Sequence, residues 1–140
     1  MRFFSSKQYG FKRDIYRSRN ELYLTRYYIL ESKLIDIYIH QFYISDHPVY
    51  HDHPANFISI PLKIGYIEHF PDRTSIIRKP FRFAFRTARE FHWVERIPYM
   101  PTPWTLFIFF KRKRNWGFLT NKGWVDHETY IKKVLFKEDT

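Results

Sequence analysis

The chain has 140 residues, of which 44% are hydrophobic and 21% aromatic, and this suits a single compact domain. It contains no cysteine, which excludes disulfides, thiolate metal sites and a cysteine nucleophile, so any metal must bind nitrogen or oxygen atoms. The net charge of +10 would suit a nucleic acid or an anionic surface, but a genome with a biased composition produces such a charge without any binding role.

The N-terminal segment is polar and basic, and it lacks the apolar core of a signal peptide. We interpret residues 1–20 as an arm with little regular structure, followed by one domain over residues 21–140. The longest apolar run, Trp104–Phe110, is too short to cross a bilayer. We therefore expect a cytoplasmic protein with no membrane-spanning segment.

Two strands are predicted over residues 21–31 and 33–44, because β-branched and aromatic residues dominate both segments. In the second segment isoleucines alternate with other residues, so Tyr38, His40 and Phe42 share one face. Both strands fit a pleated surface that is buried on one side.

The middle of the chain contains further strand patterns. Residues 56–70 form a strand pattern that is interrupted between Pro61 and Gly65, and a hairpin turn is predicted at residues 70–74. Three more segments are rich in strand-forming residues, namely 75–88, 90–97 and 104–110. About eight short strands at this spacing are typical of a sandwich or barrel, so the predicted fold class is all-β.

The last part of the chain is expected to form a short C-terminal helix of about ten residues. Asp126 can cap its first turn, and Ile131, Val134 and Leu135 would share one face. The predicted architecture is therefore a β-barrel or sandwich followed by one helix.

Segment 45–54 contains the most informative histidines. Prolines and aspartates mark bends around it, and His51 and His53 lie two residues apart. On a strand such residues point to the same side, so both imidazoles can bind one ion while Asp52 turns away. Imidazole binds Fe, Mn, Ni, Cu and Zn, and the best third ligand is His92 in a later strand. An HxH pair alone also occurs on ordinary polar surfaces, so the spacing of other residues has to support this prediction.

The residues that follow the histidine pair resemble the first cupin motif, HxH(x)3-4E(x)6G. Gly65 stands at the motif glycine, and Ile58 occupies the position of the motif glutamate, which removes a carboxylate ligand. Further along the chain, His92 stands where the second cupin motif places its ligand. Thr87 and Arg89 replace the usual proline and glycine of that second motif.

Longer segments carry a family resemblance: YLTRYYIL, IYIHQFYISDHPVYHDHPANFISIPLKIGYIE, FHWVE, PTPWTLFIFF, WGF and GWV. They resemble a family of small RmlC-like cupin proteins of uncharacterised function that are found in phage and bacterial genomes. The resemblance covers residues 20–130 and implies a jelly-roll barrel, built as a double-stranded β-helix. If the gene belongs to a phage, the protein acts in the host cytoplasm. Ile64 departs from the family pattern, which has a second glycine there.

A site formed by His51, His53 and His92 is similar to that of the thiol dioxygenases of the cupin superfamily. In those enzymes a ferrous ion binds a thiol substrate and then dioxygen. The resemblance implies a divalent metal, with Fe(II) as the first choice and Mn, Ni or Zn as alternatives. Without a carboxylate ligand the ion keeps more of its charge, which favours an anionic substrate atom.

Two glutamates are candidates to replace the missing carboxylate. Glu68 could point inward, as a further metal ligand or as a partner of a ligand, although most glutamates lie at the surface. Glu95 is the weaker candidate, because it lies three residues beyond His92 and so faces the other way on a strand.

Other side chains could contact the metal ligands or a substrate. His40 and Tyr38 could face the same cavity, but His40 could equally be a core histidine bonded to backbone. Arg26 and Arg86 could each bind a substrate carboxylate through a bidentate fork, and the sequence does not select between them. The histidines in or beside turns are expected to be exposed: His47, His69 and His127.

Three functions are hypotheses at this point. The first is a metal-dependent cupin enzyme, a non-haem Fe(II) oxygenase that acts on a small molecule. The second is a non-catalytic cupin that binds a small anionic ligand such as a nucleotide, which a phage could use to sequester a host metabolite. The third is nucleic-acid binding through the basic run 111–114 beside Trp116 and Phe118, whose rings could stack on bases. A homodimer is expected by analogy with other barrels of this kind.

Overall fold

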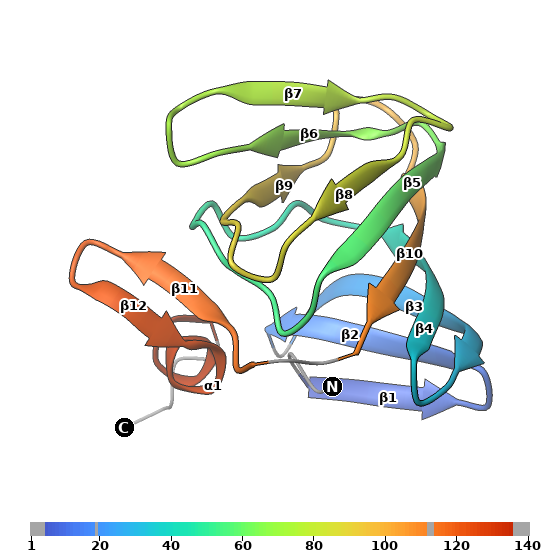
Figure 1. Ribbon diagram of the computed structural model, residues 1–140, viewed down its shortest axis with the longest axis horizontal. Coiled ribbons are helices and arrows are strands. Elements are labelled where there is room, and N and C mark those ends of the chain that lie inside the picture. Colours follow the sequence, from blue (N-terminus) through green and yellow to red (C-terminus); the bar gives the residue numbers. More distant parts are fainter. Residues whose placement is uncertain (1–4, 19, 112–113, 136–140) are drawn as a thin grey trace.

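The structure is a computed structural model that describes residues 5–18, 20–111 and 114–135 (Figure 1). Strands dominate these residues and form a seven-stranded sheet, a three-stranded sheet and a separate hairpin. One short helical segment follows near the C-terminal end. The predicted all-β class with a short C-terminal helix is thus confirmed.

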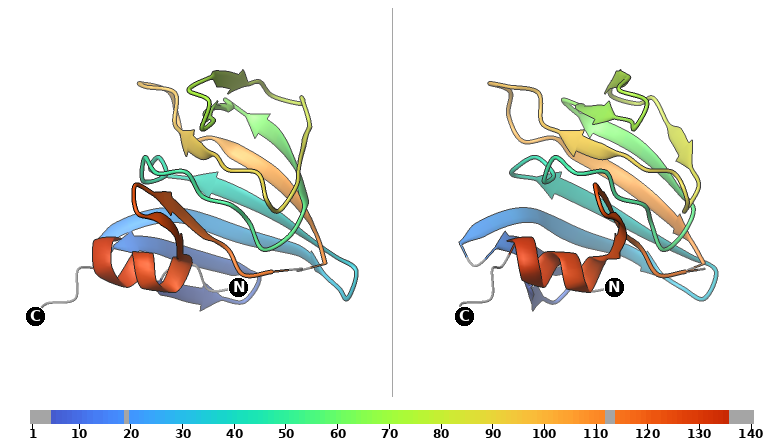
Figure 2. Two further views of the ribbon diagram at one scale, coloured as in Figure 1. Left: turned by 60° about the vertical axis from the view of Figure 1, so that its left-hand side comes forward. Right: turned by 90° about the vertical axis from the view of Figure 1, so that its left-hand side faces the viewer.

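The seven-stranded sheet has the order β1-β2-β3-β4-β10-β5-β8, and all its neighbouring pairs are antiparallel. Its strands are β1 (Ser5–Tyr9), β2 (Lys12–Ser18), β3 (Glu21–Glu31), β4 (Ile35–Phe42), β10 (Trp104–Phe110), β5 (Phe57–Lys63) and β8 (Ala84–Arg86). The three-stranded sheet consists of β7 (Ser75–Arg78), β6 (Tyr66–His69) and β9 (Trp93–Glu95), and the hairpin of β11 (Gly117–Thr120) and β12 (Gly123–Asp126). Figures 1 and 2 show the large sheet curving so that the small sheet lies opposite strands β1 to β4, with the hairpin and helix at one side.

One face of the large sheet points inward, and the alternation of side chains decides which residues it carries. In β4 the buried residues are Tyr38, His40 and Phe42, as their shared face predicts. In β5 alternate residues starting at Phe57 are buried in the same way. The isoleucines that alternate with these buried residues in β4 and β5 lie on the outer face of the sheet.

The N-terminal segment differs from the sequence prediction. Little regular structure is expected over residues 1–20, but β1 and β2 extend the large sheet through antiparallel pairing with β3. Ile15 is 2% exposed and packs with Leu24 and Phe42. A single buried apolar residue in β2 is too sparse a pattern to indicate a strand, and the pairing with β3 supplies the backbone hydrogen bonds. An independently folding domain that begins at Glu21 stays a prediction.

The chain turns sharply between β5 and β6, where Gly65 predicts an interruption. A Cβ atom on Gly65, whose φ is 85°, would lie 2.0 Å from the carbonyl oxygen of Arg78, so only glycine fits. Pro61 does not belong to the interruption, because it stays in β5 opposite Thr105. Ile64 has a φ of 74°, and this left-handed conformation costs a β-branched residue roughly 1–2 kcal/mol. A glycine at this position would avoid that cost.

The C-terminal helix begins where the sequence predicts. Asp126 is the N-cap residue of α1 (His127–Tyr130), which continues as the π-helical turn η1 (Ile131–Leu135). Ile131 is buried but Val134 is 40% exposed, so the predicted apolar face is covered only in part. Within the described parts of the chain, no helix combines the length and the apolar character needed to cross a bilayer.

Candidate metal centre

Three histidines from two separate parts of the chain meet inside the fold. His51 and His92 exchange both backbone N–H···O bonds, at 2.9 and 3.0 Å, and their ring centroids lie 4.9 Å apart. His53 follows two residues after His51, and its Nε2 lies 3.0 Å from Nε2 of His92. One ring nitrogen of each histidine lies within 4.8 Å of the others. The structure therefore brings together the three residues that the sequence analysis selects as metal ligands.

Asp52 turns away from the metal histidines, as predicted, and is 1% exposed. Its carboxylate accepts hydrogen bonds from the backbone N–H of Gly117 at 2.7 Å, Nη1 of Arg114 at 2.6 Å and Nε1 of Trp124 at 3.1 Å. These bonds tie the histidine segment to the β11–β12 hairpin. Sequence reasoning missed this role, because the three partners lie 62 to 72 residues away along the chain.

Glu68 lies directly behind one of the histidines. It is 2% exposed, and its Oε2 is 2.5 Å from Nδ1 of His92. Arg86 donates to both carboxylate oxygens, at 2.7 and 3.1 Å. Burial raises the pKa of Glu68, but the hydrogen bonds from His92 and Arg86 outweigh it and lower this pKa to about 2. The contact of Glu68 with Nδ1 of His92 orients this ring so that its Nε2 lies beside Nε2 of His53.

Two of the three histidines, His51 and His53, are held in the neutral form that a metal requires. Burial lowers the pKa of His51 to about 4 and holds the pKa of His53 well below its usual value. Unprotonated imidazole nitrogen is the species that binds a metal. Three imidazoles with ring nitrogens this close fit one divalent transition-metal ion.

A cavity of about 120 Å³ lies against the three histidines. Its wall is largely aromatic and includes Phe57, Phe107 and Phe109. The ring of Phe57 lies 4.6 Å from the ring of His53, so apolar surface reaches the metal ligands directly. A cavity of roughly 150 Å³ holds benzene, so this one suits a molecule of about five non-hydrogen atoms.

The structure changes which residue stands in place of the cupin glutamate. Sequence spacing points to Ile58, but Ile58 pairs with Phe85 on the outer face of β5, while Phe57 is 2% exposed and faces the histidines. The motif also allows a spacer of three residues, and with that spacing Phe57 takes the glutamate position. Ile64 then takes the glycine position, which explains its positive φ. The missing carboxylate is therefore replaced by an aromatic ring.

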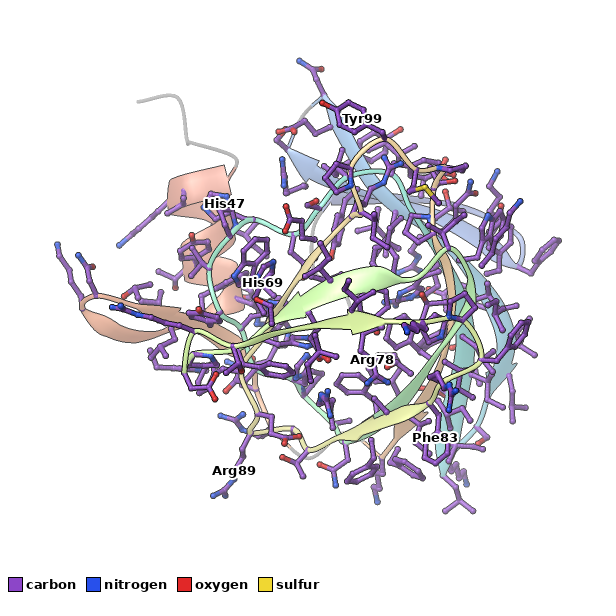
Figure 3. All side chains as sticks on the ribbon, turned by 90° about the horizontal axis from the view of Figure 1, so that it is seen from above. His47, His69, Arg78, Phe83, Arg89 and Tyr99 are labelled. Carbon is purple, nitrogen blue, oxygen red and sulfur yellow. The ribbon has the colours of Figure 1, made fainter. Side chains whose placement is uncertain are left out.

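The other departures from the second cupin motif lie at the surface. Thr87 and Arg89 are both exposed, and Figure 3 shows Arg89 pointing away from the fold. Ala88 between them is buried, and its carbonyl oxygen accepts the backbone N–H of His53 at 2.9 Å. The substitutions therefore leave the backbone contact with the histidine segment in place.

The structure separates the residues that sequence reasoning could not rank. Arg86 is engaged by Glu68, whereas Arg26 and His40 line the cavity, with Nε of Arg26 donating to Nε2 of His40 at 2.9 Å. His40 is thus a buried histidine bonded to a side chain rather than to backbone. Tyr38 stands behind His40, and its hydroxyl donates to Asp36. Glu95 faces away from the histidines, as predicted, and bonds to His69 at 2.9 Å.

The remaining histidines are less exposed than predicted. The prediction is wrong for His127, which is 6% exposed and whose Nδ1 lies 3.1 Å from the carbonyl oxygen of Trp116. His69 is half-buried because its ring stacks on Trp93 at 3.9 Å. His47 lies beside the C-terminal helix (Figure 3), against the ring of Tyr130. In each case an aromatic partner that is distant in sequence covers the imidazole.

The basic run 111–114 does not have the surroundings expected of a nucleic-acid site. Trp116 and Phe118 are 3% and 4% exposed, in a small core with the C-terminal helix, so the predicted stacking on bases is wrong. Arg114 is bonded to Asp52, and Lys111 is exposed. The middle two residues of the run, 112 and 113, lie outside the described residues.

No protein-family model and no curated protein matches the sequence. Solved structures match at low sequence identity. FeII HppE has a TM-score of 0.55 at 11% identity, and the match covers 66% of this chain and 52% of HppE. KdgF from Halomonas also has a TM-score of 0.55 at 11% identity, and its match covers 64% of this chain and 82% of KdgF. An RmlC-like cupin from Desulfovibrio desulfuricans has a TM-score of 0.51 at 12% identity, and the match covers 63% of this chain and 82% of that protein. The chain has the cupin fold.

The likeness to these cupins concerns the fold and not the activity. This chain spans 47% of the length of a matched DMSP lyase structure and 52% of the length of HppE. The cupin fold confirms the predicted jelly-roll architecture, and the cavity that contains the three histidines is lined by residues of both sheets, such as Phe107 of β10 and Val94 of β9. What the site binds and does is a separate question.

Proposed function

We propose that this cupin binds one divalent metal ion through His51, His53 and His92, and that it acts as a non-haem Fe(II) oxygenase on a small molecule. The observation that carries the proposal is the cluster of three imidazoles beside an aromatic cavity. Bound Fe(II) would supply open coordination positions for substrate and dioxygen. The similar structure of FeII HppE supports iron as the metal.

The residues around the histidines have distinct roles in this proposal. Glu68 fixes the orientation of His92, and Arg86 keeps Glu68 ionised. The ring of Phe57 excludes water from one side of the histidines. Since all three ligands are neutral, the charge of the ion favours an anionic substrate atom.

Elemental mass spectrometry of freshly purified protein tests the metal site. We expect near-stoichiometric metal in the wild type, and loss of it in a His51→Ala, His53→Ala variant. His69→Ala is the matched control, because His69 bonds to Glu95 and lies outside the cluster, and it should retain the metal. Equal metal content in the wild type and the double variant would exclude the site.

Oxygen uptake then separates oxygenase chemistry from other uses of the site. Matched cupin structures include DMSP lyases, so a metal-assisted lyase reaction is the second candidate. An oxygenase should consume oxygen in proportion to product, whereas a lyase should form product equally well without oxygen. A non-catalytic cupin would return its ligand unchanged. A nucleotide is too large to be this ligand. The cavity has a volume of about 120 Å³, which is below the roughly 300 Å³ at which typical ligand pockets begin.

A homodimer remains a proposal, supported by the outer face of the large sheet. One row of apolar side chains crosses five neighbouring strands, formed by Leu30, Ile37, Ile108, Ile58 and Phe85. Stacking of two sheets through such faces is a common way to bury them. Light scattering should show a dimer for the wild type and a monomer for Ile108→Lys. Tyr99→Lys, at a fully exposed loop position (Figure 3), should stay dimeric; a monomeric wild type would exclude the proposal.

A further inference from the structure

The connection between β7 and β8 is an exposed loop of aromatic and basic residues (Figure 1). Residues 73–89 contain six lysines and arginines and no aspartate or glutamate. Phe81 is 76% and Phe83 71% exposed, and the neighbouring side chains of Lys79 and Arg82 are exposed as well. Figure 3 shows Phe83 at the margin of the molecule. Exposed clusters of large apolar side chains are rare on protein surfaces and mark sites of contact with another protein or a membrane.

Backbone contacts hold this loop against β5, so its rings are exposed although the loop is anchored. The N–H of Phe81 donates to the carbonyl oxygen of Pro61 at 2.7 Å, and Nη2 of Arg78 donates to the carbonyl oxygen of Arg82 at 3.3 Å. Phe81 has a φ of 62°, a left-handed conformation that is unfavourable for a residue with a bulky side chain. Such conformations concentrate at functional sites, where the surrounding structure enforces them. The fold therefore presents the Phe81 ring to solvent at a cost in backbone energy.

A further cation lies at the end of β5. Lys63 is exposed, and it follows Pro61, which anchors the loop, by two residues. We call Lys63, Lys79, Phe81, Arg82 and Phe83 the Phe81 patch. Its three cations form no ion pair with any residue in the described parts of the chain. The patch thus combines two apolar rings with three charges that an external anion can neutralise.

The charge of the Phe81 patch favours an anionic partner over a second copy of the chain. Two patches in contact would bring like charges together. Phe83 lies two residues before Phe85, which ends the apolar row proposed for the dimer on the edge strand β8, so the patch adjoins that face without being its centre. The net charge of +10 also attracts the chain to an anionic surface.

A membrane surface with anionic lipids fits the patch better than a nucleic acid does. The interfacial region of a bilayer accepts apolar rings, and anionic headgroups attract lysine and arginine. Bases also stack on phenylalanine, but proteins that bind nucleic acids in this way provide a groove along which the backbone runs. The Phe81 patch instead lies on a projecting loop (Figure 1). Ile77, which is 60% exposed and lies four residues before Phe81, adds an aliphatic side chain on which bases do not stack.

We propose that the Phe81 patch attaches this cupin reversibly to the surface of membranes that contain anionic lipids. The rings of Phe81 and Phe83 enter the interfacial region, and Lys63, Lys79 and Arg82 contact the headgroups. Two rings give only weak attachment by themselves, so the cations supply the second contribution that binding requires. The patch shares no residue with the metal histidines or their cavity, and the proposal does not rest on the proposed function.

Cosedimentation of the full chain with lipid vesicles tests this attachment. The protein should bind vesicles of phosphatidylcholine and phosphatidylglycerol in equal parts, and its affinity should fall as the salt concentration rises. Vesicles of phosphatidylcholine alone should bind at least about tenfold more weakly. A Phe81→Ser, Phe83→Ser variant and a Lys79→Gln, Arg82→Gln variant should each bind the anionic vesicles at least about tenfold more weakly than the wild type.

Two variants serve as matched controls. Tyr99→Ser removes a fully exposed ring on another side of the molecule (Figure 3). Lys33→Gln, Lys122→Gln removes two exposed cations outside the patch and gives the same net charge as the basic variant of the patch. Both controls should bind within about twofold of the wild type, because salt screens charges that are distant from the membrane. Since all the substituted side chains are exposed, every variant should fold, and circular dichroism checks this.

Each of the following results would overturn the inference. An absence of cosedimentation with the anionic vesicles, or equal affinity for the two kinds of vesicle, would exclude attachment through anionic lipids. Unchanged binding of the Phe81→Ser, Phe83→Ser variant would exclude the patch as the contact. Binding of a single-stranded DNA oligonucleotide that depends on both rings, without binding to vesicles, would assign the patch to nucleic acids. Conversion of a dimer to a monomer by the same two substitutions would assign the patch to the contact between subunits.

Discussion

Replacement of Glu68 by glutamine tests whether the carboxylate behind His92 helps to make a metal site from three histidines. In the wild type, Oε2 of Glu68 lies 2.5 Å from Nδ1 of His92, and Arg86 lies 2.7 Å from the other oxygen. Glutamine can still accept one hydrogen bond, but it has no charge, so His92 becomes a weaker donor to the metal. Loss of such a partner lowers metal affinity by roughly 10–100-fold, which is about 1.4–2.7 kcal/mol.

The same substitution also breaks an ion pair, and this effect must be separated from the first. Glu68 is 3% and Arg86 17% exposed in their side chains, so Glu68→Gln leaves a largely buried guanidinium without its carboxylate. We expect a loss of about 2–3 kcal/mol in the free energy of unfolding, below the value for a fully buried pair. A Glu68→Gln, Arg86→Gln double variant should recover part of this stability but none of the metal affinity.

Competition for Zn(II) with a chromophoric chelator measures the affinity without redox chemistry, and near-ultraviolet circular dichroism checks the fold. The control is Glu95→Gln, because Glu95 bonds to His69 and lies outside the histidine cluster. This control should bind Zn(II) as the wild type does. A Zn(II) affinity of Glu68→Gln within twofold of the wild type, in a folded protein, would refute the reasoning.

Three further changes should alter stability in defined directions. Ile64→Gly should raise the free energy of unfolding, measured by urea denaturation, by about 0.5–1 kcal/mol, because glycine adopts the φ of 74° without strain. A decrease would mean that the packing of the Ile64 side chain stabilises the fold by more than the backbone strain costs. Asp52→Ala should lower the free energy of unfolding by about 3 kcal/mol, since a buried backbone N–H and two partly buried side chains lose their acceptor. Asp72→Ala in an exposed turn should change it by less than about 1 kcal/mol. Acid should destabilise the metal-free protein. Folding lowers the pKa of His51 from 6.5 to about 4 and the pKa of Glu68 from 4.5 to about 2. Between these values the unfolded state binds more protons than the folded state, so the free energy of unfolding falls as the pH falls. Thermal melts should therefore show full stability above pH 6.5 and a progressive loss down to pH 2, and a melting temperature that stays constant from pH 7 to pH 4 would contradict this.

Local patterns were sufficient for the strands between residues 21 and 110 and for the histidine pair. Side chains alternate with a period of two in any strand, so the buried face of β4 follows from the sequence of residues 35–42 alone. His51 and His53 share a side for the same reason, and the hairpin turn at residues 70–74 follows from its proline and aspartate. The spacing to His92 was sufficient only through the resemblance to cupins, because nothing local connects the two segments.

Predictions from sequence patterns are wrong where contacts between distant segments determine the orientation or burial of a residue. Sequence spacing places Ile58 at the glutamate position, but the pairing of β5 with β8 and β10 turns Ile58 outward and Phe57 inward. Residues 5–18 carry too few apolar side chains to indicate strands, and only their pairing with β3 makes them part of the sheet. His127 is buried by Trp116, which directly precedes β11. In these cases the contacts connect parts of the chain that sequence periodicity cannot relate.

The sequence by itself determined which residues could bind a metal, because imidazole chemistry and two-residue spacing are local properties. The tertiary structure decided how those residues are used. It placed Glu68 behind His92, engaged Arg86 with that glutamate, and left Arg26 lining the cavity. Each of these outcomes depends on burial and on partners from other strands, and the free energy of a charged side chain depends on such surroundings far more than on its neighbours in sequence.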